Sequence, residues 1–520
     1  MCTTVTPRPR QRRREQLAPV AVARVLLGAQ KRRGLLAGEL EQLVDGRDEV
    51  RLGRALGVGA VDLAAQAVTH PAVVHAALAE PGAQVLLAKL RPVFRVRHRT
   101  HVDHTGHAAA AQQRHQAVDT VIGVANGVDP HGFMIDPIAM KGFRFAGVSA
   151  GIKSGGAKDV AVLVSETAAS AAAVFTRNRV AAAPVKVSKG ALRRSGGKAR
   201  AVVVNSGNAN ACTGARGMAD ARAMAARVAG ALDVPRQNVI VSSTGVIGVP
   251  LPMDRVTAGI DGAMAELSAR KFDDFSQAIL TTDKGPKTAS GRLTIDGTKI
   301  SLLGCTKGAG MIAPNMATTL SFVVTDAQIA PAVLREALSA ATDATFNAIT
   351  VDGDTSTNDM ILVMANGTAG NRSLRGKSAR LFGEALTELL SELAHALMRD
   401  GEGVHHVVNV RVRGARSTDA ARKVAREIAN SSLVKTAIAG QDPNWGRILA
   451  AAGNAGVPLD PEKLSLRLND VLIAEHGVGV ADDDATETRA AAVMAEPSYD
   501  VIVDLGASHE YVTINANYRT

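Results

Sequence analysis

Short valine-rich runs alternate with small-residue amphipathic segments from about residue 141 onward, and this alternation limits the folds that the chain can adopt. Apolar runs bounded by polar residues predict strands over Asp159–Val164, Ala199–Asn205, Asn238–Ser243, Leu320–Val324 and Val407–Val412. Helices are predicted over Asp220–Leu232, Met253–Leu267, Pro331–Ala341, Leu381–Met398 and Thr418–Ala429. Leu293–Leu302 predicts a hairpin, because Asp296-Gly297 is a turn pair. Since the order lacks a strict βαβ rhythm, it favours a layered α+β fold over a doubly wound sheet.

The composition is that of a globular protein without a membrane span or a disulfide framework. Hydrophobic residues make up 46% and charged residues 21% of the 520 residues, which are ordinary values and suggest several domains. No run of about 18 uncharged apolar residues occurs. The cysteines Cys2, Cys212 and Cys305 lack the spacing of metal ligands and fit a reducing cytosol. We therefore expect a cytoplasmic protein with no bound metal.

The net charge of +11 does not indicate a nucleic-acid partner once its distribution is considered. Residues 1–133 hold 18 Lys and Arg against 11 Asp and Glu, so they account for +7 and the other 387 residues for only +4. The chain also shows no basic stripe interleaved with aromatic residues. We expect no nucleic-acid partner.

Residues 1–133 differ from the rest of the chain. They use 16 Arg to 2 Lys and hold 8 of the 13 histidines. No compact apolar region follows the basic run Arg10–Arg14, which argues against a signal peptide, and several acidic residues argue against a transit peptide. The histidines from His98 to His115 lack carboxylate or cysteine partners at ligand spacing. We interpret this region as an extension foreign to the catalytic fold, with Met134 or Met140 as plausible true starts.

A glycine-rich turn and a small-residue loop, Lys307–Ala317, lead directly to Thr318 and Thr319 and then to a buried strand. A threonine hydroxyl is a poor nucleophile without an adjacent base, but a threonine freed at a chain N-terminus carries its own base, the α-amine. That amine titrates near pH 8, so much of it is available near neutrality. The residues alone also fit an ordinary tight turn into a core strand.

The segment from Lys307 to Thr318 resembles the self-cleavage segment of the ornithine acetyltransferase family, the glutamate N-acetyltransferases of arginine biosynthesis. The resemblance begins around Lys141 and runs to Thr520. It implies cleavage between Ala317 and Thr318, which would give an α chain of residues 134–317 and a β chain of 318–520. The family more often has Met at the position of Thr319, so a cut before Thr319 stays open. The resemblance also implies a layered αββα sandwich of the N-terminal-nucleophile kind, a smaller C-terminal α/β domain, and a heterotetramer of two α and two β chains.

Thr244 and Gly245 follow a predicted buried strand. A Thr-Gly turn can present a hydroxyl and a backbone N–H to one oxygen, as acyl transfer requires, although a plain strand-ending turn is equally compatible with these residues. The resemblance implies that Thr244 and Gly245 form the oxyanion pair.

Five further residues match positions at which the family binds its amino-acid substrate: Thr281, Lys307, Glu402, Asn515 and Thr520. Glycines on both sides allow Glu402 an unusual loop conformation, and its carboxylate suits a substrate ammonium. The family usually continues with Ala-Thr-Lys where this chain has Val404-His405-His406. Without the resemblance, the C-terminal residues would be interpreted as a frayed tail.

Three more segments are interpreted as lying around the site. Asp352–Asp359 resembles a family motif and is expected close to it; calcium is rejected because Thr357 stands where a calcium-binding loop needs glycine. Asn205–Gly214 is interpreted as a supporting loop, with Cys212 as a small buried residue. Gln441–Arg447 is expected to be structural and near the site.

The resemblance implies an enzyme that transfers acetyl from N-acetylornithine to glutamate through an acetyl-threonine intermediate, with Thr318 as nucleophile. It needs no cofactor, because the acetyl group arrives already bonded. Whether acetyl-CoA is a second donor stays open. The alternative is an aminopeptidase or amidase of N-terminal-nucleophile design, in which water takes the acyl group.

Overall fold

The computed structural model describes residues 140–312, 319–480, 484–507 and 510–519, and of residues 484, 510–513 and 515–519 the backbone alone. The extension 1–133 and the residues Ala317, Thr318 and Thr520 therefore lie outside the described residues.

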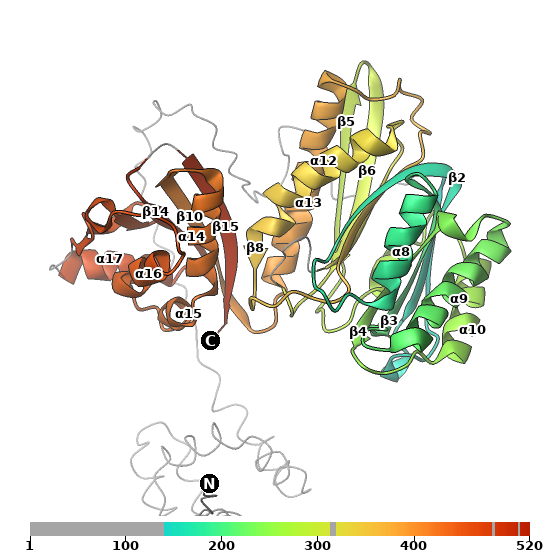
Figure 1. The fold of residues 1–520 in the computed structure, drawn as a ribbon, viewed down its shortest axis with the longest axis horizontal. Coiled ribbons are helices and arrows are strands. Elements are labelled where there is room, and N and C mark those ends of the chain that lie inside the picture. The colour runs from blue at the N-terminus through green and yellow to red at the C-terminus, as the bar shows by residue number, and fades with distance from the viewer. Residues whose placement is uncertain (1–139, 313–318, 481–483, 508–509, 520) are drawn as a thin grey trace, which may run out of the picture. The chain divides into compact units, whose positions relative to one another are not determined.

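The first sheet has the strand order β4-β3-β2-β9-β7-β6-β5, and β1 pairs with β2 beside this path (Figure 1). Its strands are β1 (Phe143–Val148), β2 (Val160–Phe175), β3 (Lys198–Asn208), β4 (Val239–Val246), β5 (Lys287–Ile295), β6 (Thr298–Lys307), β7 (Leu320–Thr325) and β9 (Met360–Ala365). The helices of this part are α8 (Ala183–Arg194), α9 (Gly214–Leu232), α10 (Met253–Ala265), α11 (Phe272–Ala278), α12 (Pro331–Ala344) and α13 (Lys377–Arg399), with 3-10 turns η1 (Ser154–Gly156), η2 (Arg236–Asn238) and η3 (Phe346–Ala348).

Strand β2 joins two halves of this sheet. Its first residues pair with β1 and β3, whereas Ser170–Phe175 pairs with β9, and the register to β3 shifts between Val164 and Ala169. Successive side chains on a strand point to opposite faces, so each half has an inner and an outer face. The inner faces share one core, which includes Leu163 and Phe322.

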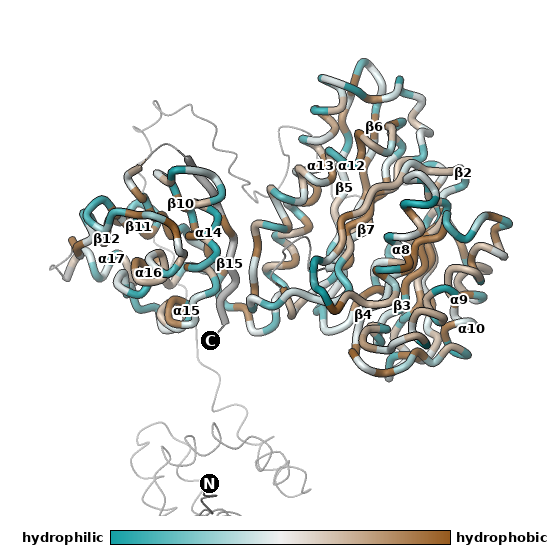
Figure 2. Tube along the Cα trace, viewed as in Figure 1, coloured by the Kyte–Doolittle hydropathy of each residue, from teal (hydrophilic) through white to brown (hydrophobic). Residues whose placement is uncertain are grey.

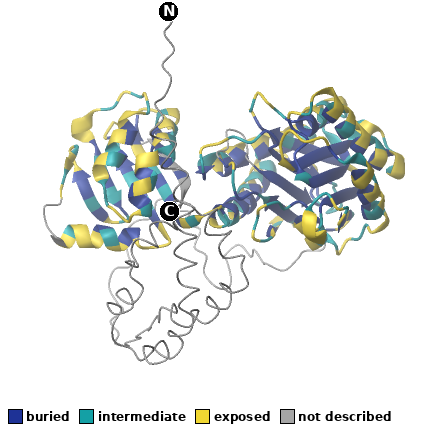
Figure 3. Cartoon of the chain, turned by 90° about the horizontal axis from the view of Figure 1, so that it is seen from below, coloured by how far each residue is buried: buried dark blue, intermediate teal, exposed yellow. Residues whose placement is uncertain are grey.

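The outer faces carry helices. On one half, Val160 and Val162 pack against α9 and α10, and on the other, Val323 and Ile361 pack against α12 and α13. The order of layers is therefore helix, sheet, sheet, helix, as expected from the sequence. Figure 2 shows the hydrophobic colour running along these central strands, and Figure 3 shows the strands buried and the exposed residues on helices and loops.

The second sheet has the order β13-β12-β11-β14-β10-β15-β8 and its own apolar core. Its strands are β8 (Ile349–Thr350), β10 (Val404–Ala415), β11 (Ser465–Leu468), β12 (Val471–Glu475), β13 (Val478–Gly479), β14 (Ser498–Asp504) and β15 (Glu510–Arg519). Its helices are α14 (Thr418–Asn430), α15 (Ser432–Ala439), α16 (Trp445–Gly453) and α17 (Asp484–Met494), with the 3-10 turn η4 (Pro461–Lys463).

The C-terminal segment differs from what its residues alone indicated. It is the strand β15, which pairs with β10 on one side and with β8 on the other, rather than a frayed tail. No helix in the described part of the chain is both long and apolar enough to cross a membrane.

Candidate active site

A cavity of about 1060 Å³ lies beside the ends of β3, β4, β6 and β7. Five of the residues singled out in the sequence line it, although they come from widely separated segments: Thr244, Gly245, Thr281, Lys307 and Glu402. Thr319 lines it as well. The fold therefore brings these candidates together at one place.

Lys307, the last residue of β6, makes the central polar contacts of the cavity. Its Nζ donates hydrogen bonds to Oγ1 of Thr244 and Oγ1 of Thr281, each at 2.9 Å. Burial lowers the pKa of the Lys307 ammonium, and the nearby Asp283 carboxylate opposes that effect. An ammonium held between two hydroxyls in this way is a positioned cation, able to receive a carboxylate.

Gly245 occupies a position that only glycine fits. Its φ of +132° lies in a region that side chains disfavour, and a Cβ would stand 2.2 Å from the carbonyl carbon of Gly207. The close approach occurs where the β3–β4 register is irregular, at Gly207 and Asn208. The turn after Thr244 is thus pressed against the end of β3, which fixes its backbone at the cavity wall.

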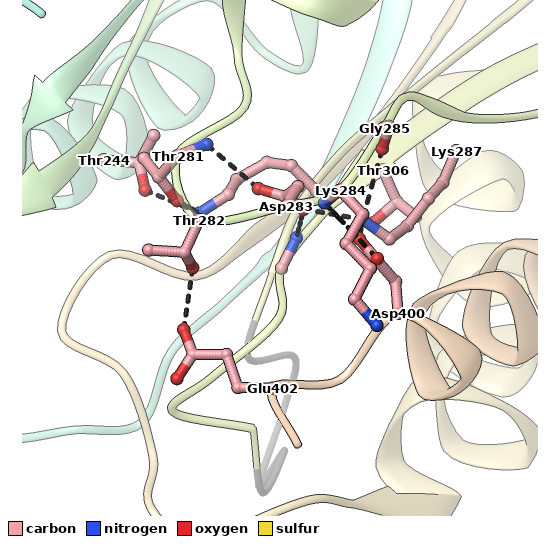
Figure 4. A network of polar contacts seen from close by, with 12 residues as sticks. Thr244, Thr281, Thr282, Asp283, Lys284, Gly285, Lys287, Thr306, Asp400 and Glu402 are labelled. Carbon is pink, nitrogen blue, oxygen red and sulfur yellow. Dashed lines mark hydrogen bonds and ion pairs between the residues drawn. The ribbon is translucent and has the colours of Figure 1, made fainter. Parts of the chain in front are cut away.

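Glu402 reaches the cavity from the loop between α13 and β10. Its N–H donates to the carbonyl oxygen of Ala309 at 2.8 Å, and its Oε1 accepts a hydrogen bond from Oγ1 of Thr282 at 2.8 Å (Figure 4). A Cβ on Gly310 would stand 3.0 Å from the Glu402 carboxylate, so glycine leaves that carboxylate room. The result is an exposed carboxylate at the cavity wall, suited to a substrate ammonium.

A buried ion-pair network holds these binding segments in place. The Lys287 ammonium lies 2.7 Å from a carboxylate oxygen of Asp283 and 2.5 Å from one of Asp400, and the Lys287 and Asp283 side chains are 4% and 0% exposed (Figure 4). Asp283 also accepts hydrogen bonds from the N–H groups of Thr281 and Gly308, at 2.9 and 2.6 Å. One carboxylate therefore fixes both the Thr281 turn and the end of β6.

The charges explain the titration of Asp283. Burial alone acts to raise its pKa, but the Lys307 and Lys287 ammonium groups outweigh burial, and the net pKa is lowered. Asp283 is therefore the stable anion of the network. The sequence indicated Thr281 and Lys307 but not Lys287, whose burial depends on contacts far along the chain.

The segment Asp352–Asp359, which is expected close to the active site, reaches the cavity. Ser356, Thr357, Asn358 and Asp359 line the wall. The amide of Asn358 donates to the carbonyl oxygens of Ala209 and Ser243, at 2.6 and 2.8 Å, and so joins this segment to β4. Asp359 was not singled out. It is 2% exposed, one of its carboxylate oxygens has no hydrogen-bond partner, and burial raises its pKa.

Other expectations have different outcomes. Cys212 is exposed rather than buried, because it takes a left-handed turn (φ +57°) just before α9. Trp445 does not line the cavity; a Cβ on Gly479 in β13 would stand 2.9 Å from its ring, so its contacts belong to the second sheet. The backbone of Asn515 pairs with Asn409 and Ile349, and its side chain lies outside the described residues, as do Thr318 and Thr520.

The family model and the curated relatives at 42–50% identity agree on one family. The ArgJ family model matches residues 144–520. The arginine biosynthesis bifunctional protein ArgJ of Symbiobacterium thermophilum is 50% identical over 398 residues, which are 74% of this chain and 98% of that protein. The ArgJ protein of Geobacter sulfurreducens is 47% identical over 395 residues, 73% of this chain and all (100%) of that protein.

Among solved structures, the ornithine acetyltransferase of Mycobacterium tuberculosis complexed with ornithine is 42% identical, with a TM-score of 0.30, over 34% of this chain and 94% of that one. The family match rests on the sequence comparisons.

Proposed function

Because the chain belongs to the ArgJ family, it is an acetyltransferase of arginine biosynthesis, and we propose that it moves the acetyl group of N-acetylornithine to glutamate through an acetyl-threonine intermediate. The observation that carries this proposal is the convergence of Thr244, Thr281, Lys307 and Glu402 on one cavity from four separate segments. Together they offer a hydroxyl donor, a cation and an anion within one site.

The proposed first half-reaction uses Thr318 as the first residue of a new chain. Its Oγ attacks the acetyl carbonyl carbon, and its α-amine takes the hydroxyl proton and passes it to the departing ornithine nitrogen. In the second half-reaction, the neutral amine of glutamate attacks the acetyl-threonine ester, and the proton lost from that amine returns to the threonine oxygen. Thr244 and Gly245 stabilise the oxyanion in both steps. The hydrogen bond from Lys307 to Thr244 supports this role, because it leaves the Thr244 hydroxyl proton free to donate.

Binding of the amino acid follows from charge. The substrate carboxylate pairs with Lys307 beside Thr281, and the side-chain ammonium of N-acetylornithine pairs with Glu402. Asn515 and Thr520 complete the binding site from the C-terminus. The course of β15, which carries the backbone of Asn515 between β10 and β8, supports an ordered C-terminal contribution.

We propose that the chain is cut between Ala317 and Thr318, into an α chain of residues 134–317 and a β chain of residues 318–520, and that two of each associate. Residues 1–133 contribute nothing to catalysis in this proposal. Acetyl-CoA is proposed as a second acetyl donor, which matches the word bifunctional in the names of the relatives.

Intact-mass analysis combined with N-terminal sequencing tests the cleavage. We expect a smaller fragment that begins Thr-Thr-Leu-Ser, and Thr318→Ala should leave one uncut chain without transfer activity. Thr319→Ala is the matched control and should still be cut. A fragment beginning at Thr319 would move the nucleophile by one residue.

Steady-state kinetics test the covalent step. Double-reciprocal plots at several glutamate concentrations should be parallel, because ornithine leaves before glutamate binds. Intersecting lines with no acetyl group on the Thr318 fragment would contradict the acetyl-enzyme. Free acetate as the main product, in place of acetylglutamate, would favour the amidase alternative.

A further inference from the structure

Three charged side chains bond three consecutive residues on the wall of the cavity. Nζ of Lys307 donates to Oγ1 of Thr281, and Glu402 accepts from Oγ1 of Thr282. Leu280 comes just before Thr281, and its carbonyl oxygen accepts a hydrogen bond from Nζ of Lys153 at 3.1 Å. Because residues two apart in an extended segment lie within about 7 Å, two cations and one anion lie along one short stretch of the wall. The roles proposed above use Lys307 and Glu402 and assign none to Lys153.

Lys153 is held at this wall by its own backbone. The buried carboxylate of Asp159 accepts hydrogen bonds from the N–H groups of Ala150, Ile152 and Lys153, at 2.6, 2.6 and 2.9 Å. The stem of Lys153 lies over Gly207, where a Cβ would stand 2.8 Å from its Cγ. A lysine fixed at both its backbone and its stem loses little further freedom when its ammonium binds a ligand.

The ammonium of Lys153 makes no ion pair with a described residue. It differs in this from Lys158, which also lines the cavity but is paired with Asp274. Partial burial lowers the pKa of Lys153, with Asp159 and Asp283 opposing that shift. An anionic ligand beside the ammonium would stabilise its charged form. Beside Lys307, the cavity therefore holds a second positioned lysine that makes no ion pair with a described residue.

The two substrates of the proposed reaction explain why such a cation is needed. N-acetylornithine ends in an ammonium, whereas glutamate ends in a second carboxylate, and both must react at the same threonine. The Glu402 carboxylate attracts the side-chain ammonium of N-acetylornithine and repels the side-chain carboxylate of glutamate. Lys307 is already occupied by the carboxylate that both substrates share. We propose that Lys153 binds the side-chain carboxylate of the acceptor and so selects a dicarboxylic amino acid. This inference rests on the proposed function.

Glutamine tests this role, because it has the shape of glutamate without the side-chain charge. Lys153→Met should lower kcat/KM for glutamate by roughly 10- to 100-fold, the range expected for a charge-assisted hydrogen bond. The kcat/KM for glutamine should stay within about 2-fold of the wild-type value, which corresponds to a free-energy change too small to indicate a lost contact. The rate at which N-acetylornithine acetylates the enzyme should also be unchanged. Lys153→Arg should restore most of the preference for glutamate.

Lys158→Met is the matched control, since it removes another lysine of the same cavity, and it should leave the glutamate-to-glutamine ratio intact. Several results would overturn the inference: an equal fall for both acceptors in Lys153→Met, a fall in the donor half-reaction of the same size, or a wild-type enzyme that does not prefer glutamate over glutamine. If Lys153→Met fails to fold, the same ratio measured on Lys153→Gln decides. A wild-type enzyme that forms no acetyl-enzyme from N-acetylornithine would instead overturn the proposed function.

Discussion

The two sheets differ in what they bury. In the first, the buried side chains at strand ends and adjoining loops include many polar groups, among them Asn205, Asn208, Ser243 and Asp359. In the second, the core is built mainly from valine, leucine, isoleucine and alanine, and the buried polar groups among the described residues from 400 onward are few, among them the His406 side chain and the hydroxyl of Tyr499. Both regions bury many apolar side chains, so the difference lies in the polar groups that accompany them.

Burying a polar group without a partner costs free energy, so a protein keeps such groups where they are bonded or used. Several buried polar side chains of the first sheet, Asn205, Asn208 and Ser243 among them, lie where β3 and β4 end, and Asn358 donates hydrogen bonds to the backbone after β3 and in β4. The part of the chain that forms the second sheet reaches the cavity through Glu402, in the loop just before β10. Its exposed ion pairs, and those of its glycines that have open space around them, should tolerate change.

The largest difference between the two regions is expected when one glycine in each is replaced by alanine. Gly245→Ala places a methyl group 2.2 Å from the Gly207 backbone at a φ of +132°, so the N–H proposed for the oxyanion is displaced. We expect kcat to fall about 10²- to 10³-fold, the cost of one lost donor. Gly453→Ala, in α16 of the second part, meets no atom within 4 Å. It should leave kcat unchanged and stabilise the helix by up to about 1 kcal/mol. Rate assays with thermal unfolding measure both, and equal kcat values would remove the distinction between the sheets.

The next largest difference is expected in the free energy of unfolding, when one ion pair in each region is removed. Lys287→Met leaves Asp283 and Asp400 without their shared cation, and the free energy of unfolding should fall by about 3–5 kcal/mol. KM for N-acetylornithine should rise, because Asp283 would no longer hold Thr281 and Gly308 in place. Arg413→Met removes a pair with Asp504 in the second sheet whose side chains are 49% and 29% exposed. That loss should be at most about 1 kcal/mol. Denaturant titration separates the two, and similar losses would show that burial does not decide the strength of these pairs.

The smallest predicted effect is a pH dependence. Burial raises the pKa of Asp359 above its value in the unfolded chain, so between these two pKa values the folded protein binds the extra proton. The contribution of Asp359 to stability should therefore be greatest below the ordinary carboxyl pKa and be lost as the pH rises through the raised pKa. Asp283 has the opposite shift, which acts only at lower pH. Asp359→Asn should flatten the fall in the free energy of unfolding, measured by denaturant titration across that pH range; an unchanged slope would assign it to another group.

Features set by local chemistry were predictable from the sequence. The Asp296-Gly297 hairpin is confirmed: both residues have positive φ, 49° and 79°, as the tight turn requires. The helix predicted from Pro331 begins there and continues to Ala344. The proline suits the first helical turn because it lacks only an N–H that would be unbonded in any case.

Features set by distant contacts were not predictable. β2 continues to Phe175, whereas the sequence predicted a strand that ends near Val164. The stretch Ala169–Phe175 is rich in alanine and has little strand propensity, so the local residues do not predict it. It is a strand because it pairs with β3 and β9. α9 begins at Gly214 rather than Asp220, because its first residues include two glycines, Gly214 and Gly217, which have a low helix propensity. In the site, resemblance pointed to Thr244, Lys307 and Glu402. Lys153, Lys287 and Asp359 carry no local signal, because their importance comes from which charges and backbone groups surround them.

The strand order of the first sheet has a consequence for maturation. A cut before Thr318 would assign β2, β3 and β6 to one fragment and β7 and β9 to the other. Yet β9 and β7 lie between β2 and β6 in the sheet. The second fragment would then fill the middle of a sheet whose two sides belong to the first. Neither fragment could close that sheet alone, since each would expose unpaired strand edges. Folding must therefore precede cutting. The two fragments would afterwards be held together, with no covalent link, by the backbone hydrogen bonds of two strand pairs, β2–β9 and β6–β7.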